Sequence, residues 1–128
     1  MPQIIAWTIF LFLLGGYNIS ASPQDLQGDP KNGNRIYEQH CIRCHGPKGD
    51  GNGEEGQYLV VKPANFHSVQ SSTKTNADLF ITIKYGVVFS PMHGWGDRLK
   101  DQEIMDVIGY IRFLAPFRAL TSHQKTPH

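Results

Sequence analysis

The sequence predicts an all-α domain in which three main helices are joined by long, glycine-rich loops. Three segments carry apolar residues at helical spacing, and no strand-like alternation of apolar and polar residues runs for any length. The chain has 128 residues, which is enough for one domain, and its 13 glycines and 8 prolines indicate that much of this domain is loop.

The first predicted helix covers residues 31–41, where Ile36 and Tyr37 lie near one face. A loop over residues 46–57 follows, and its five glycines favour turns with positive φ. This loop is not a phosphate-binding loop, because no strand precedes it and no Gly-Lys-Ser/Thr follows. Residues 58–72 are predicted to be irregular, partly buried chain.

The second predicted helix covers residues 77–85, with either Thr75 or Asn76 as its N-cap and Gly86 as its end. Its apolar stripe consists of Leu79, Phe80 and Ile83.

The third predicted helix runs from Asp101 to Leu114. Acidic Asp101 and Glu103 favour its start, Arg112 favours its end, and Pro116 stops it. Its apolar stripe consists of Ile104, Val107, Ile108, Ile111 and Leu114. A loop over residues 87–99 separates this helix from the second one.

The two ends of the chain differ in composition from the domain between them. Residues 1–21 are predicted to be a secretory signal peptide, because an apolar stretch over residues 4–16 is followed by small residues. An uncleaved membrane anchor is the alternative, although the stretch is shorter than the roughly 20 residues a spanning helix needs. We therefore expect export to the periplasm. Residues 22–30 are predicted to be a linker, residues 31–115 the domain and residues 116–128 a flexible tail.

The only cysteines, Cys41 and Cys44, are followed directly by His45 in a C-x-x-C-H motif. This motif attaches haem covalently: the two thiols form thioether bonds with the two vinyl groups, and the histidine becomes the proximal iron ligand. The sequence therefore predicts one covalently bound haem c.

The two cysteines are also compatible with three other functions. A thiol–disulfide redox motif normally opens a helix after a strand, whereas Cys41 and Cys44 close a helical segment. A structural zinc site needs four ligands, and the chain has no second cysteine pair, so His40 and His67 would have to complete the set. A plain disulfide is compatible with export. None of these three functions explains why a histidine, His45, stands at the position that haem attachment requires.

The residues resemble a class I cytochrome c over positions 31–115. Tyr37 and Gly33 stand one and two helical turns before the motif, as in the first helix of that family, and Val107 and Tyr110 occupy the matching places on the last helix. The resemblance implies a small cytochrome c fold wrapped around one haem. It also implies that Gly33 and Tyr37 meet Val107 and Tyr110 where the two helices cross.

Local motifs are similar to those of a bacterial branch of the family. The run Cys44–Gly53 has its C-H-G-x-x-G-D-G-x-G pattern, and Lys62–Phe66 matches the proline-containing segment that follows. The methionine loop of that branch resembles Pro91–Asp97, which precedes the last helix here.

The resemblance implies that Met92 is the distal iron ligand. Met105 fits the apolar pattern of a helix and is expected to be core, whereas the neighbours of Met92 are loop residues. The family usually has Pro directly after this methionine, but this chain has His93 there and Pro91 before it. His93 is therefore the rival ligand.

Other residues around the haem are expected from general chemistry. The carbonyl of Pro63 or Pro47 could orient the proximal histidine. Trp95 could cover the haem edge or bind a propionate. The remaining candidates for pairing with propionates are the basic residues Arg43, Lys48 and Arg98.

The predicted function is one-electron transfer, either as a free carrier or as the electron-transfer subunit of an exported or membrane oxidoreductase, so we expect redox partner proteins rather than a catalysed reaction. The net charge of +1 gives no bulk attraction for nucleic acid. The alternative is a haem protein with an open sixth site that binds small ligands or acts as a peroxidase. A thiol redox or metal-binding module without haem is the third possibility.

Overall fold

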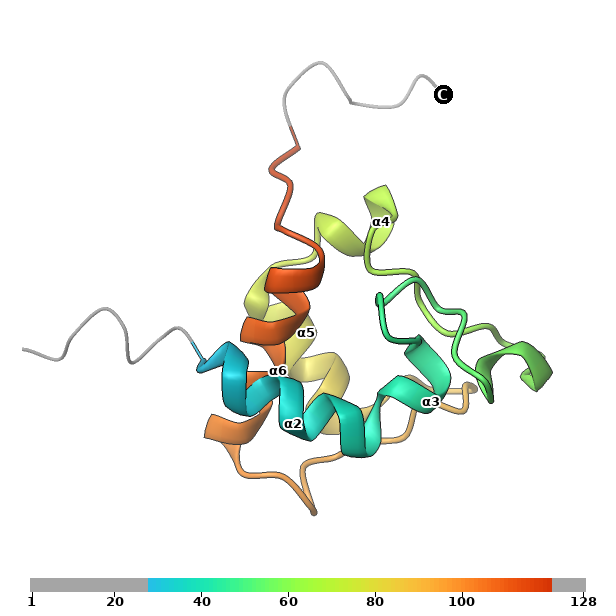
Figure 1. The fold of residues 1–128 in the computed structure, drawn as a ribbon, viewed down its shortest axis with the longest axis horizontal. Helices are drawn as coiled ribbons and strands as arrows, with labels where there is room; N and C mark the ends of the chain where they lie inside the picture. The colour runs from blue at the N-terminus through green and yellow to red at the C-terminus, as the bar shows by residue number, and fades with distance from the viewer. Residues whose placement is uncertain (1–27, 121–128) are drawn as a thin grey trace, which may run out of the picture.

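The computed structural model describes residues 28–120 as a helical domain (Figure 1). No β-strand occurs in this range, where an isolated bridge joins Gly86 and His93. The prediction of an all-α fold with three main helices is therefore confirmed. In chain order the elements are α2 (Pro30–His40), α3 (Ile42–His45), the 3-10 helix η2 (Gly56–Tyr58), α4 (Val69–Ser72), α5 (Asn76–Tyr85) and α6 (Asp101–Leu114).

The crossing of α2 and α6 forms the centre of the fold, and Figure 1 shows α2 lying across α6. A β-carbon at Gly33 would clash with the Asp106 carbonyl oxygen and lie 3.0 Å from the Val107 nitrogen. Only glycine therefore allows the two backbones to approach this closely. One turn further along, the rings of Tyr37 and Tyr110 pack with their centroids 5.2 Å apart. The crossing expected from the resemblance is confirmed.

Capping residues fix where the main helices begin. The Asp29 carboxylate accepts a 2.9 Å hydrogen bond from the Lys31 N–H at the start of α2. Thr75 caps α5 in a capping box with Asp78, so this helix begins at Asn76, one residue earlier than predicted. Helix α6 has the predicted bounds, and Gly86 ends α5 with a φ of 78°.

The structure also contains three short helices that the sequence pattern did not predict, namely α3, η2 and α4. Helix α4 lies within residues 58–72, which were expected to be irregular, and the Ser68 hydroxyl caps it by accepting the Ser71 N–H at 3.2 Å. The first helix ends at His40, and Cys41 links it to the single turn α3.

The hydrophobic core joins α2, α5 and α6. Its fully buried side chains include Ile36, Tyr37, Ile104, Val107 and Ile108. Beyond α6, the Arg118 N–H donates a 2.9 Å hydrogen bond to the Ser72 carbonyl, so the first residues after the helix run beside α4.

The predicted signal peptide or anchor over residues 1–21 lies outside the described residues, as does most of the predicted linker. Among the helices of residues 28–120, none is long and apolar enough to cross a membrane.

Candidate functional site

All four predicted haem-binding residues, Cys41, Cys44, His45 and Met92, line one cavity of about 580 Å³. The first three come from the α2–α3 junction, and Met92 comes from the loop between α5 and α6. The cavity volume lies in the range of roughly 300–1,000 Å³ that is typical of sites for small molecules and cofactors. The apolar part of its wall includes Leu59, Val61, Phe66, Leu79, Ile83, Leu99, Val107 and Ile111.

The glycine-rich loop after α3 holds the C-x-x-C-H backbone from behind. The Gly53 N–H donates to the Cys44 carbonyl at 3.1 Å, and the Gly51 N–H donates to the His45 carbonyl at 2.9 Å. A β-carbon at Gly53 would clash with the Arg43 carbonyl oxygen. The glycines therefore let the loop lie against α3 closely enough to satisfy carbonyls that a helix end leaves free.

The His45 imidazole is oriented by a backbone carbonyl and an aromatic ring. Its Nδ1 lies 3.3 Å from the Ala64 carbonyl oxygen, and its ring stacks on Phe66 with the centroids 4.8 Å apart. The carbonyl belongs to Ala64 and not to Pro63 or Pro47, so that prediction was wrong. If Nδ1 carries the proton that Ala64 accepts, Nε2 is free to bind a metal. Burial lowers the pKa of His45, although the hydrogen bond to Ala64 opposes this shift.

Cys41 and Cys44 are half-buried thiols at the wall of the same cavity. Burial, followed by the neighbouring Cys44, raises the pKa of Cys41 to about 12. At neutral pH the Cys41 side chain of the haem-free chain is therefore a neutral thiol and a poor spontaneous nucleophile.

The Met92 backbone is fixed on both sides. Its N–H donates to the Ser90 hydroxyl at 3.1 Å, and its carbonyl accepts the Val87 N–H at 2.8 Å. The loop is tied back to α5 because the Trp95 N–H donates to the Ile83 carbonyl at 2.9 Å. The Met92 side chain is half-buried and packs against the hydrophobic core.

His93, the rival ligand, also lies on the cavity wall, but its side chain is exposed. Its ring lies 4.6 Å from the Trp95 ring, and its Nδ1 is 3.0 Å from the Gly94 carbonyl oxygen. Trp95 also contacts His40, with the ring centroids 4.9 Å apart. Trp95 therefore contacts two histidines at the cavity wall.

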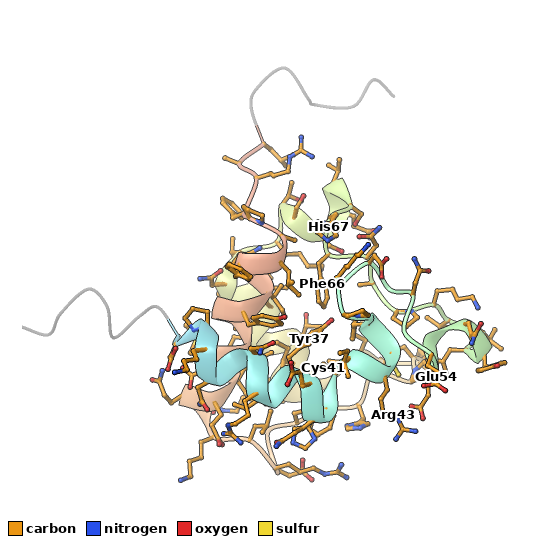
Figure 2. The ribbon with its side chains drawn as sticks, viewed as in Figure 1. Tyr37, Cys41, Arg43, Glu54, Phe66 and His67 are labelled. Carbon is orange, nitrogen blue, oxygen red and sulfur yellow. The ribbon has the colours of Figure 1, made fainter. Side chains whose placement is uncertain are left out.

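The basic residues that were candidates for the propionates do not line the cavity. Figure 2 shows Arg43 on the outer side of α3, where it pairs with Glu55. Lys48 is exposed, and the Arg98 guanidinium lies 5.5 Å from the centre of the Trp95 ring. The wall instead carries Lys62 and Lys74, which sequence reasoning missed because neither residue belongs to a recognisable motif.

The residues of the cavity fit a haem group. It has two thiols for covalent attachment, an imidazole with one nitrogen already held by a carbonyl, and a thioether on a fixed loop. Within the described part of the chain, no three His, Cys, Asp or Glu side chains are grouped so that they could hold a metal ion themselves. The zinc alternative therefore finds no ligand group in residues 28–120.

Comparison with known protein families identifies the family to which the chain belongs. A family model described as "Cytochrome C oxidase, cbb3-type, subunit III" matches residues 28–111, which is more than half of the sequence. The protein is a class I c-type cytochrome whose cofactor is covalently attached haem c. It belongs to the family of cytochrome c domains that this cbb3-type model describes.

Solved structures agree on the fold. One similar chain comes from the "Kuenenia stuttgartiensis reducing HAO-like protein complex Kustc0457/Kustc0458", with 26% sequence identity and a TM-score of 0.59. The match covers 71% of this protein and 48% of that chain, so this protein spans about half the length of that relative. A second, the "KustC0563 c-type cytochrome", has 24% identity and a TM-score of 0.53, with 65% of this protein and 96% of that chain covered. No curated protein sequence matches the chain.

Proposed function

We propose that this cytochrome carries one electron at a time on a haem attached through Cys41 and Cys44, with His45 as the proximal ligand and Met92 as the distal ligand. The observation that carries the proposal is that all four side chains line a single cavity. The hydrogen bonds at both ends of the Met92 backbone support a fixed thioether at this wall.

When bound, the haem supplies an iron that is oxidised or reduced by one electron. The residues of the chain hold this group and set its environment. The Ala64 carbonyl keeps His45 in one orientation and makes its free nitrogen a better electron donor. The soft sulfur of Met92 favours ferrous iron, which raises the reduction potential. The apolar walls keep water away.

We further propose that the protein works outside the cytoplasm with redox partner proteins, as a free carrier or as the electron-transfer subunit of an exported or membrane oxidoreductase. The apolar residues 4–16 support export, with cleavage after residue 21 or retention as an anchor as the two outcomes. The similarity to one chain of a protein complex supports a role beside larger partners.

The test is an optical spectrum of the exported protein, oxidised and reduced, measured beside Met92→Ala and the matched variant His93→Ala. We expect a low-spin c-type spectrum with a sulfur-to-iron band that Met92→Ala loses and His93→Ala keeps. A low-spin spectrum that lacks this band, and that becomes high-spin only in His93→Ala, would transfer the ligand role to His93. A high-spin spectrum that neither variant changes would indicate an open sixth site, and hence ligand binding or peroxidase activity.

A further inference from the structure

Lys62 and Lys74 are the lysines on the wall of the haem cavity, and no Asp, Glu or Arg among the described residues lines it. The two lysines differ in their surroundings. Lys62 is exposed, and its ammonium already donates a 2.6 Å hydrogen bond to the Gln57 carbonyl. Lys74 is half-buried, and its ammonium forms no ion pair within the described part of the chain. The carboxylate on which its charge acts is the exposed Asp78 of α5, whose pKa is lowered first by hydrogen bonds with Thr75 and then by Lys74.

Haem has two chemically different edges. The vinyl groups that react with the cysteines lie on one edge, and two propionate carboxylates lie on the opposite edge. Helix α3, which contains Cys44, and helix α4, which leads to Lys74, stand apart in the fold (Figure 1). A haem attached at Cys41 and Cys44 would therefore present its carboxylates to a part of the cavity wall away from α3.

The wall beside Lys74 is polar. Gln70 and Ser71 of α4 and Ser68, its cap, all line the cavity. The side chains of Gln70 and Ser71 form no hydrogen bond with the described residues through their amide or hydroxyl groups. One ammonium, one amide and one hydroxyl are thus available to a carboxylate at this end of the cavity.

Donors from helix α6 and from the residues that follow it fix the backbone of this polar segment. The Arg112 guanidinium donates to the Lys74 carbonyl and, at 2.9 Å, to the Asn76 side-chain oxygen. The Arg118 N–H donates to the Ser72 carbonyl at 2.9 Å. Because these donors come from a different part of the chain, the position of Lys74 does not depend on the four-residue helix α4 alone.

We propose that Lys74, together with Gln70 and Ser71, is the binding subsite for a propionate carboxylate of the haem. The subsite rests on the proposed function, because it requires haem to be attached at Cys41 and Cys44. Lys74 stabilises the ionised carboxylate, and its positive charge also favours the reduced iron. Lys74 therefore links the reduction potential to the protonation of the carboxylate.

The test compares the reduction potential of the haem-loaded wild type, Lys74→Gln and Lys74→Arg between pH 4 and pH 9. The matched control is Lys31→Gln, which removes an exposed lysine at the start of α2. We expect Lys74→Gln to lower the reduction potential at neutral pH. The reduction potential falls as the carboxylate loses its proton, and we expect the midpoint of this fall to lie about 1 pH unit higher in Lys74→Gln than in the wild type. Lys74→Arg keeps the charge and should retain the wild-type profile, as should Lys31→Gln.

Ser71→Ala provides a second, independent variant that keeps the lysine. We expect it to shift the profile in the same direction by a smaller amount. Profiles of Lys74→Gln and Ser71→Ala that superimpose on the wild type, in proteins with a normal covalent c-type spectrum, overturn the subsite and leave the proposed function standing. A wild type without covalent haem overturns both.

Discussion

The Tyr37 hydroxyl donates a 2.7 Å hydrogen bond to the carbonyl of Gly46, the residue that follows the C-x-x-C-H motif. Tyr37 is only 1% exposed and also packs against Tyr110 of α6. Burial, followed by the neighbouring Cys41, raises its pKa above the usual value, so the hydroxyl stays protonated and able to donate. One side chain thus connects the α2–α6 crossing to the haem-attachment segment.

Replacing Tyr37 with Phe tests this connection. The variant keeps the ring but removes the donor, and the Gly46 carbonyl retains only a 3.2 Å hydrogen bond from the Gly49 N–H. We expect a loss of about 1 kcal/mol in the free energy of unfolding, equivalent to roughly 4–8 °C in Tm. Thermal and urea unfolding measure it. Tyr58→Phe, at a side chain that is 80% exposed, is the control and should leave Tm unchanged.

Gly33→Ala tests the close approach of α2 and α6. The added methyl group would clash with the Asp106 backbone, which cannot move without separating the two helices. We expect a loss of roughly 1–3 kcal/mol in the free energy of unfolding, despite the better helix propensity of Ala. Gln39→Ala, at an exposed position of the same helix, is the control. Equal stability of the two variants would contradict the close crossing.

The long amphipathic helices could be predicted because each carries its own start and stop residues. Helix α6 has acidic residues at its start, five apolar residues on one face and Pro116 beyond its end, and its bounds were predicted correctly. The start of α5 was ambiguous because Thr75 and Asn76 are both good caps. The partnership of Thr75 with Asp78 decides between them, since each side chain accepts a backbone N–H of the other residue.

Helix α4 could not be predicted, because four residues are too few to show a helical period. Its place depends on contacts with distant parts of the chain, such as the hydrogen bond from Arg118 to Ser72. The same limit applies inside the site. The C-x-x-C-H motif predicts which residues bind haem, but it does not indicate which carbonyl faces His45 or which lysines line the cavity. The contact of Ala64 with His45 and the position of Lys74 on the cavity wall both depend on the folded chain.

Asp106 is a buried carboxylate that accepts three hydrogen bonds, from the Asn32 amide at 2.7 Å, the Asp29 N–H at 2.8 Å and the Gln102 amide at 3.0 Å. Burial alone would raise its pKa, but these three donors outweigh burial and lower it. The ionised form is therefore favoured more in the folded protein than in the unfolded chain. Its contribution to stability is present above the unfolded pKa and is lost as the pH falls through the folded pKa.

Asp106→Asn should therefore reduce the free energy of unfolding by about 1–3 kcal/mol at pH 7, and the difference from the wild type should shrink below about pH 4. Urea unfolding at a series of pH values measures this difference. Glu54→Gln, an exposed carboxylate on the glycine-rich loop, should show no such trend. A difference that stays constant with pH would mean that the charge of Asp106 contributes nothing beyond the shape of its side chain.

Ser90→Ala tests how the methionine loop holds Met92. The Ser90 hydroxyl accepts the Met92 N–H and donates to the Val87 carbonyl at 3.0 Å, so its loss removes two bonds within the loop. We expect covalent haem to be retained, because the C-x-x-C-H segment is untouched. The sulfur-to-iron band should weaken, and carbon monoxide should bind the reduced protein faster than it binds the wild type. Val88→Ala, at a side chain in the same loop that is 79% exposed, is the matched control. Equal carbon monoxide binding by both variants and the wild type would show that the core packing of Met92, and not the loop hydrogen bonds, keeps the thioether in place.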